Sequence, residues 1–159
     1  MNNLDSTDIR LLELLQNDSE MSTKELAAAV NLSPTPVYER VKRLENEGYI
    51  KKYVALLDAE KLHMGFTVYC NVKLVGHSYD VFHRFMDRVV EIPEVTECYG
   101  LAGDCDYLLK VRAPDMDYYQ RFILDVLGRI ESISSVNSMF VLSEVKHTHV
   151  LPLRTKKQP

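Results

Sequence analysis

The chain has 159 residues, 46% of them apolar, and its 23 acidic and 19 basic side chains leave a net charge of −4. This length and composition suit one domain or two small ones and exclude a wholly disordered chain. No apolar run is long enough to cross a bilayer, and the first residues lack the basic and apolar blocks of a signal peptide. We therefore expect a cytoplasmic protein with no membrane partner.

The amino-terminal part of the sequence predicts three helices, near residues 5–16, 22–30 and 34–47. The second helix opens with a capping box, because the side chains of Ser22 and Glu25 can each accept a hydrogen bond from the backbone N–H of the other. Apolar residues recur at helical spacing in all three helices and predict a shared core. They are Leu12, Leu15, Leu26, Val37, Val41 and Leu44.

The third helix begins with Ser33 and Pro34. Serine can cap the free backbone N–H groups at a helix start, and proline lacks an N–H where no partner is needed. Only the short turn from Val30 to Leu32 separates this helix from the second one. Two short helices joined by so tight a turn predict a helix-turn-helix, whose second helix can lie in the major groove of double-stranded DNA.

The predicted DNA contacts lie at the start of the third helix, along its outer face and just beyond its end. They are Ser33, Thr35, Tyr38, Glu39, Arg40, Lys42, Arg43 and Lys51. Arg40 leans toward the buried side, so an ion pair with Asp8 or Glu25 competes with a DNA contact. We expect Arg43→Ala to abolish operator binding and to leave folding intact. The acidic net charge indicates that one copy binds weakly and that two or more copies hold a site.

Residues 49–57 have strand character and predict either a wing or the start of a linker, and residues 58–65 separate this unit from the rest. The remainder carries an internal repeat, in which Lys73 matches Lys110 and Phe85 matches Phe122 at the same interval. Each half follows the order strand, helix, strand, judged from its apolar spacing. The closing strands are expected near residues 95–101 and 135–146.

Two strand–helix–strand units in tandem predict a ferredoxin-like βαββαβ domain, with both helices on one side of an antiparallel sheet. The expected fold class is α+β, with an N-terminal three-helix (winged) helix-turn-helix domain joined to a C-terminal ferredoxin-like domain. The expected parts are the DNA-binding domain 1–57, the linker 58–65, the second domain 66–153 and a basic tail 154–159. The open sheet face is partly apolar and predicts a dimer surface.

Several longer runs are distinctive. The first domain contains Leu32-Ser33-Pro34-Thr35-Pro36 and Glu39-Arg40-Val41-Lys42-Arg43-Leu44-Glu45. The second contains Gly103-Asp104-Cys105-Asp106-Tyr107 and Glu144-Val145-Lys146. In these runs the chain resembles the Lrp/AsnC family of bacterial and archaeal transcription regulators. The resemblance implies a DNA-binding regulator that forms homodimers, often assembled into octamers, and that responds to an amino acid or a related small molecule.

The resemblance also implies an effector crevice at the turn from Gly100 to Asp106, where dimers of the family meet. Glycines there allow a ligand to approach the backbone, and carboxylates can bind an α-ammonium group. The candidate residues are Gly100, Leu101, Ala102, Gly103, Asp104, Asp106 and Ser138. Gly100 and Cys105 stand where larger residues are usual, which indicates room for a side chain larger than alanine. The alternative is a tight β-hairpin in which Gly and Asp only form the turn.

Two other functions remain open. Siroheme decarboxylases share the two-domain plan, but an enzyme would have no reason to keep the basic third helix, so we expect no enzyme activity. An architectural chromatin protein would bind promoter and random DNA alike at matched salt. We expect no cofactor or metal. Cys70, Cys98 and Cys105 lack the spacing of a zinc or redox motif, and His147 and His149 face one way on an expected strand but lack a third ligand.

Overall fold

The computed structural model describes residues 4–153, which form two compact units. One unit contains the chain up to Leu56 together with the segment from Lys146, and the other runs from Leu57 to Val145. Residues 146–153, expected in the second domain, thus cluster with the first unit. There the Gln16 side-chain amide donates to the Leu151 carbonyl at 3.0 Å and accepts from its N–H at 2.9 Å. The predicted basic tail, 154–159, lies outside the described residues.

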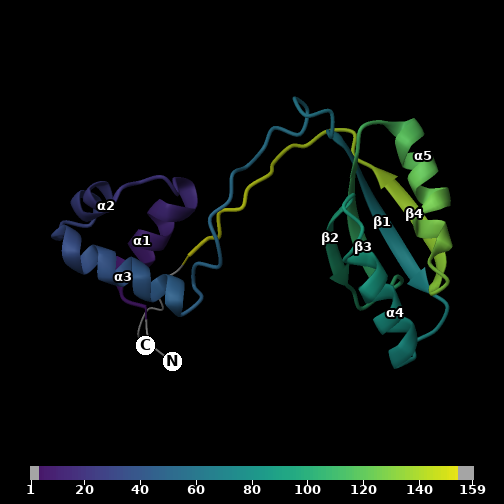
Figure 1. The fold of residues 1–159 in the computed structure, drawn as a ribbon, viewed down its shortest axis with the longest axis horizontal. Coiled ribbons are helices and arrows are strands. Elements are labelled where there is room, and N and C mark those ends of the chain that lie inside the picture. The colour runs from purple at the N-terminus through teal and green to yellow at the C-terminus, as the bar shows by residue number, and fades with distance from the viewer. Residues whose placement is uncertain (1–3, 154–159) are drawn as a thin grey trace. The chain divides into compact units, whose positions relative to one another are not determined.

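The first unit holds the three predicted helices (Figure 1). They are α1 (Ser6–Asn17), α2 (Thr23–Ala29) and α3 (Pro34–Asn46). Capping boxes begin α1, at Asp5 and Asp8, and α2, at Ser22 and Glu25. The buried core consists of Leu11, Leu15, Leu26, Ala27, Val37 and Leu44. Leu12 and Val41, which were predicted as core residues, pack against this cluster but are only partly buried.

Residues 49–57 form no strand, so a stranded wing is not formed there and the alternative interpretation as a linker fits the structure. The side chains from Lys51 to Asp58 are exposed. Tyr53 is tied to α3, because its hydroxyl donates to Glu45 Oε1 over 3.0 Å. Partial burial and this hydrogen bond to a carboxylate raise the pKa of Tyr53 to about 12.

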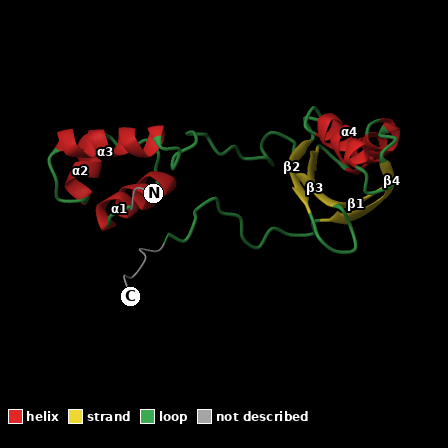
Figure 2. Ribbon diagram, turned by 90° about the horizontal axis from the view of Figure 1, so that it is seen from below, coloured by secondary structure: helices red, strands yellow, loops and turns green. Residues whose placement is uncertain are grey.

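The second unit is a four-stranded antiparallel sheet with helices on one face (Figure 2), which confirms the predicted βαββαβ arrangement. The strands lie in the order β2-β3-β1-β4. The elements along the chain are β1 (Phe66–Leu74), α4 (Tyr79–Val89), β2 (Val95–Gly100), β3 (Tyr107–Ala113), α5 (Met116–Asp125), the 3₁₀ turn η1 (Leu127–Arg129) and β4 (Ile133–Phe140). Because β4 ends at Phe140, the prediction that His147 and His149 lie on a strand is wrong.

Alternation along β1 and β3 places one side of the sheet in a core beneath the helices. Val68, Cys70 and Val72 of β1 are fully buried in this core. The internal repeat has a structural counterpart, because Phe85 of α4 and Phe122 of α5 are both buried in the same cluster.

Within residues 4–153, no helix is long and apolar enough to cross a membrane. The same range contains no group of three or more histidine, cysteine or acidic side chains placed to hold a metal ion. Cys70, Cys98 and Cys105 are free thiols. Burial raises the pKa of the Cys70 and Cys98 thiols, which disfavours their reactive thiolate forms.

Candidate DNA-binding helix and effector turn

The start of α3 presents hydroxyl groups to solvent. Ser33 occupies the N-cap position, but its side chain makes no capping hydrogen bond, so the predicted serine cap is wrong. Pro34 and Pro36 supply no N–H to the first turn, which reduces the number of donors that a cap would have to satisfy. The Ser33 and Thr35 side chains are both exposed at the positive end of the helix dipole. This is a suitable environment for a phosphate group.

The outer face of α3 carries one aromatic ring, one cation and one carboxylate that are all exposed. Tyr38 is 53% exposed, and Glu39 and Lys42 are also open to solvent. Lys42 Nζ lies 5.9 Å from the centre of the Tyr38 ring and 2.7 Å from Glu45 Oε2. The bond to Glu45 raises the pKa of Lys42 and lowers that of Glu45, so both groups stay charged at neutral pH.

Arg40 and Arg43 turn inward and bind the carboxylate of Asp8, which is only 1% exposed. Arg40 Nη1 lies 2.7 Å from Asp8 Oδ1 and 2.7 Å from Asp5 Oδ2. Arg43 Nη2 lies 2.6 Å from Asp8 Oδ2. The Arg40–Asp8 pair confirms one of the predicted alternatives, whereas Arg43 has a structural partner that the sequence did not indicate. The expectation that Arg43→Ala leaves folding intact conflicts with this geometry.

These ion pairs fix the position of α3 against α1. Burial alone would raise the pKa of Asp5, but hydrogen bonds from the Asp8 backbone N–H and from Arg40 outweigh it and lower this pKa. Hydrogen bonds to Asp8 and Asp5 likewise raise the pKa of Arg40. Asp8 also accepts the Asp5 N–H within the capping box, so one buried carboxylate holds both the start of α1 and the middle of α3.

The structure therefore divides the eight predicted DNA contacts. Thr35, Tyr38, Glu39 and Lys42 share an exposed face of α3, and Ser33 lies at its start. Arg40 and Arg43 belong to the Asp8 cluster and are only partly exposed. Lys51 is exposed in the linker that follows α3.

The turn between β2 and β3 carries most of the predicted effector residues. It is closed by a hydrogen bond from the Leu101 N–H to the Asp106 carbonyl, of 2.8 Å. Gly103 has a φ of +155°, a backbone conformation that side-chain-bearing residues rarely adopt. Leu101, Ala102, Gly103 and Asp104 are exposed, and a Cβ atom at Gly100 would meet only the Tyr107 ring, at 3.7 Å. The turn thus combines an open backbone with the exposed carboxylate of Asp104.

The Asp106 carboxylate is already bound within the chain. Its Oδ2 accepts the Leu74 N–H over 2.8 Å, and its Oδ1 lies 3.2 Å from Nε2 of His77. Its own N–H donates to the Val72 carbonyl. Asp106 therefore anchors the turn to the end of β1, and neither His77 nor this anchoring role was indicated by the sequence.

Ser138 lies away from the turn, in the middle of β4 opposite Cys70. Its hydroxyl is 2.6 Å from the Tyr119 hydroxyl, which is in turn 3.1 Å from the Cys70 sulfur. Burial and the contact with Cys70 raise the pKa of Tyr119, so the phenol stays protonated. Within one chain, the structure thus assigns Ser138 to a polar cluster beneath α5.

Comparison with known families covers both units. Residues 67–151 match the Lrp/AsnC ligand binding domain, and residues 4–51 match a winged helix-turn-helix DNA-binding domain. The chain is 41% identical over 150 residues to the DNA-binding transcriptional activator DecR of Escherichia coli (strain K12). This match covers 94% of this chain and 99% of DecR. It is 39% identical over 153 residues to the leucine-responsive regulatory protein of the same strain. That match covers 96% of this chain and 93% of the regulatory protein.

Solved structures show the same fold. A transcriptional regulator of Neisseria meningitidis, solved as a complex with L-Met, has a TM-score of 0.91 and 37% identity and covers 94% of this chain and 97% of its own. An AsnC family regulator of Agrobacterium tumefaciens has a TM-score of 0.89 and 38% identity, with the same coverage. Each of these four matches extends over nearly the whole of this chain. The chain is therefore a member of the Lrp/AsnC family of transcriptional regulators.

Proposed function

We propose that this chain is a sequence-specific regulator that acts in the cytoplasm by placing α3 in the major groove of double-stranded DNA. The observation that carries this proposal is the exposed face of α3, where Thr35, Tyr38, Glu39 and Lys42 are all open to solvent. Ser33, Thr35 and Lys42 would contact phosphate, and Tyr38 and Glu39 would reach base edges. The Asp8 cluster holds this helix at a fixed angle to α1.

We further propose that the second unit binds an amino acid at the β2–β3 turn. Asp104 is the exposed carboxylate that would bind the α-ammonium group, and Gly103 leaves the backbone open beside it. Asp106, bound to Leu74 and His77, would hold the turn in place. L-methionine is the first effector to test, because the neisserial regulator was solved with it. It also satisfies the expected preference for a side chain larger than alanine.

The open face of the sheet is the proposed dimer surface, and dimers would assemble further into octamers. Tyr99 and Met139 on this side are 51% and 44% exposed. The same face carries a charged pair in which Nζ of the buried Lys110 lies 2.9 Å from Glu97 Oε1. Pairing two copies would bring two α3 helices to one DNA site, which compensates for the weak binding expected of an acidic chain.

Genomic footprinting of the native protein, with and without added amino acids, tests this function as a whole. We expect a limited set of occupied promoters whose occupancy changes with at least one amino acid. Uniform coverage without preferred sites would indicate an architectural protein and would contradict the proposal. We propose no enzymatic role, and the purified protein should be colourless and should not bind iron-porphyrins.

A further inference from the structure

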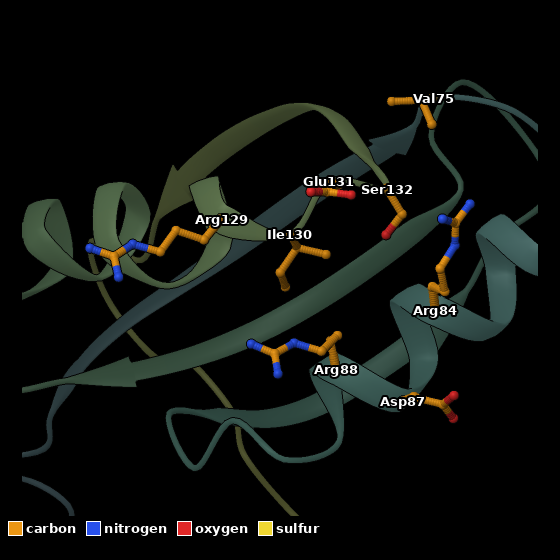
Figure 3. A pocket seen from close by; sticks show the side chains of 8 residues that line it. All are labelled: Val75, Arg84, Asp87, Arg88, Arg129, Ile130, Glu131 and Ser132. Carbon is orange, nitrogen blue, oxygen red and sulfur yellow. The ribbon is translucent and has the colours of Figure 1, made fainter.

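A cavity of about 500 Å³ lies between α4 and the connection from η1 to β4. Two arginines of α4, Arg84 and Arg88, line one side of it, and Ile130 and Ser132 line the other (Figure 3). The cavity lies entirely within the second unit and includes no residue of the β2–β3 turn. It is thus separate from the proposed amino acid site.

The two α4 arginines form a concentration of positive charge that the protein does not neutralise. Arg84 and Arg88 are four residues apart and therefore project from the same face of the helix, where like charges destabilise it. Among residues 4–153, the Arg88 guanidinium has no hydrogen-bond or ion-pair partner, and the Arg84 guanidinium donates only to the Asp80 backbone carbonyl, over 3.2 Å. An anion bound between them would remove this repulsion.

The opposite wall contains a buried hydroxyl without a partner. Ser132 is only 5% exposed, and its Oγ makes no hydrogen bond to any described residue, although its backbone carbonyl accepts the Val75 N–H. A buried hydroxyl left without a hydrogen-bond partner destabilises the folded protein. Figure 3 shows the Ser132 hydroxyl turned toward α4. A ligand oxygen in the cavity would supply the missing acceptor.

The remaining charges at the cavity do not cancel the arginines. Asp87 and Glu131 line it as well, but within the described chain neither forms an ion pair with Arg84 or Arg88. Figure 3 shows the Asp87 carboxylate pointing away from Arg88. Arg129 adds a third cation, although its guanidinium is 3.3 Å from Asp125. The cavity is therefore cationic on its α4 side.

We propose that this cavity binds the oxyanion group, carboxylate or phosphate, of a small metabolite. Arg84 and Arg88 would bind the charged oxygens, and the Ser132 hydroxyl would donate to one of them. Val75 and Ile130 supply apolar surface for the rest of the ligand. The ligand would be a second input to the protein, independent of the effector at the β2–β3 turn.

Equilibrium dialysis of the full chain with radiolabelled inorganic phosphate, at constant ionic strength, tests this site. We expect Arg88→Gln to weaken phosphate binding about tenfold and Ser132→Ala to weaken it about threefold, because each removes a direct donor. The control is Arg121→Ala. Arg121 is exposed on α5 outside the cavity, so this variant should bind phosphate as the native chain does. Ser132→Ala should melt no lower than the native protein without phosphate, since it removes only an unpaired hydroxyl.

Competition then identifies the source of the oxyanion. Displacement of labelled phosphate by succinate indicates a carboxylate ligand, and displacement by glucose 6-phosphate alone indicates a phosphate ester. The proposal is overturned if the native chain binds no phosphate, or if Arg88→Gln and Ser132→Ala bind it as the native chain does. It is also overturned if Arg88→Gln leaves phosphate binding unchanged and instead weakens binding to random duplex DNA, since the arginines would then contact a DNA backbone.

Discussion

Arg43 Nη2 lies 2.6 Å from Oδ2 of Asp8, so an arginine of α3, the proposed DNA-binding helix, is held by a carboxylate buried at the start of α1. Arg40 binds the other oxygen of the same carboxylate. The basic residues of α3 thus fall into two groups. Arg40 and Arg43 position the helix, and Lys42, with the exposed residues beside it, is available to DNA.

Replacing Asp8 by alanine should destabilise the first unit. The substitution leaves two arginines without their shared partner and removes part of the capping box. Because these arginines are partly exposed, we expect a loss of about 2–3 kcal/mol, below the range for a fully buried pair. Hydrogen–deuterium exchange of the α1 and α3 amides measures this locally. Arg10→Ala, which breaks the exposed pair with Glu13, should cost less than about 1 kcal/mol. Equal protection in the two variants would refute the anchoring role of Asp8.

Lys42→Ala should weaken DNA binding without loosening the fold. The lysine has an exposed side chain, and its ion-pair partner, Glu45, also accepts a hydrogen bond from the Tyr53 hydroxyl. Loss of one phosphate contact should reduce the slope of log affinity against log salt by about 1. Fluorescence anisotropy with a promoter duplex at several salt concentrations measures this slope. Lys61→Ala, outside the DNA-binding unit, is the control, and an equal change there would mean that Lys42 has no specific contact.

The stability of the first unit should depend on pH through Asp5. Hydrogen bonding holds its folded pKa below the ordinary value of 3.8, so its contribution is complete above that value and is lost as the pH falls through the folded pKa. The stability difference between the native chain and Asp5→Asn should therefore shrink from about pH 5 to about pH 3. Urea denaturation followed by circular dichroism tests this, with the exposed Glu20→Gln as control. A difference that grows toward low pH would show that the sign is wrong.

The two aspartates of the β2–β3 turn should respond differently to substitution. Asp106→Ala removes the acceptor of the Leu74 N–H and should lower stability by about 1–2 kcal/mol. Asp104→Ala should leave stability unchanged and weaken L-methionine binding at least about tenfold, because a charge-assisted hydrogen bond to the ammonium group is lost. Thermal melting and calorimetry separate these effects. Unaltered methionine binding by Asp104→Ala would remove this residue from the proposed site.

The sequence predicted the helices and the domain plan well because these depend on local patterns. Ser22 and Glu25 specify their capping box within four residues, and apolar spacing specifies α3. Apart from the Arg40–Asp8 pair, it failed where residues distant in the sequence meet. Nothing local indicates that Arg43 reaches Asp8, that His77 contacts Asp106, or that Ser138 bonds Tyr119 beneath α5. The strand expected at 49–57 reflects β propensity that no neighbouring strand satisfies within the described chain.

Selection of binding sites from a random duplex library tests most directly whether the exposed face of α3 reads DNA. The native protein should enrich one motif, and Glu39→Gln should relax the preference at a single base position, because a carboxylate there can accept from cytosine N4. Glu20→Gln, exposed and outside α3, should enrich the native motif. If the native protein enriches no motif, the exposed face of α3 does not read DNA. The same conclusion follows if Glu39→Gln and variants of every other exposed α3 residue all enrich the native motif.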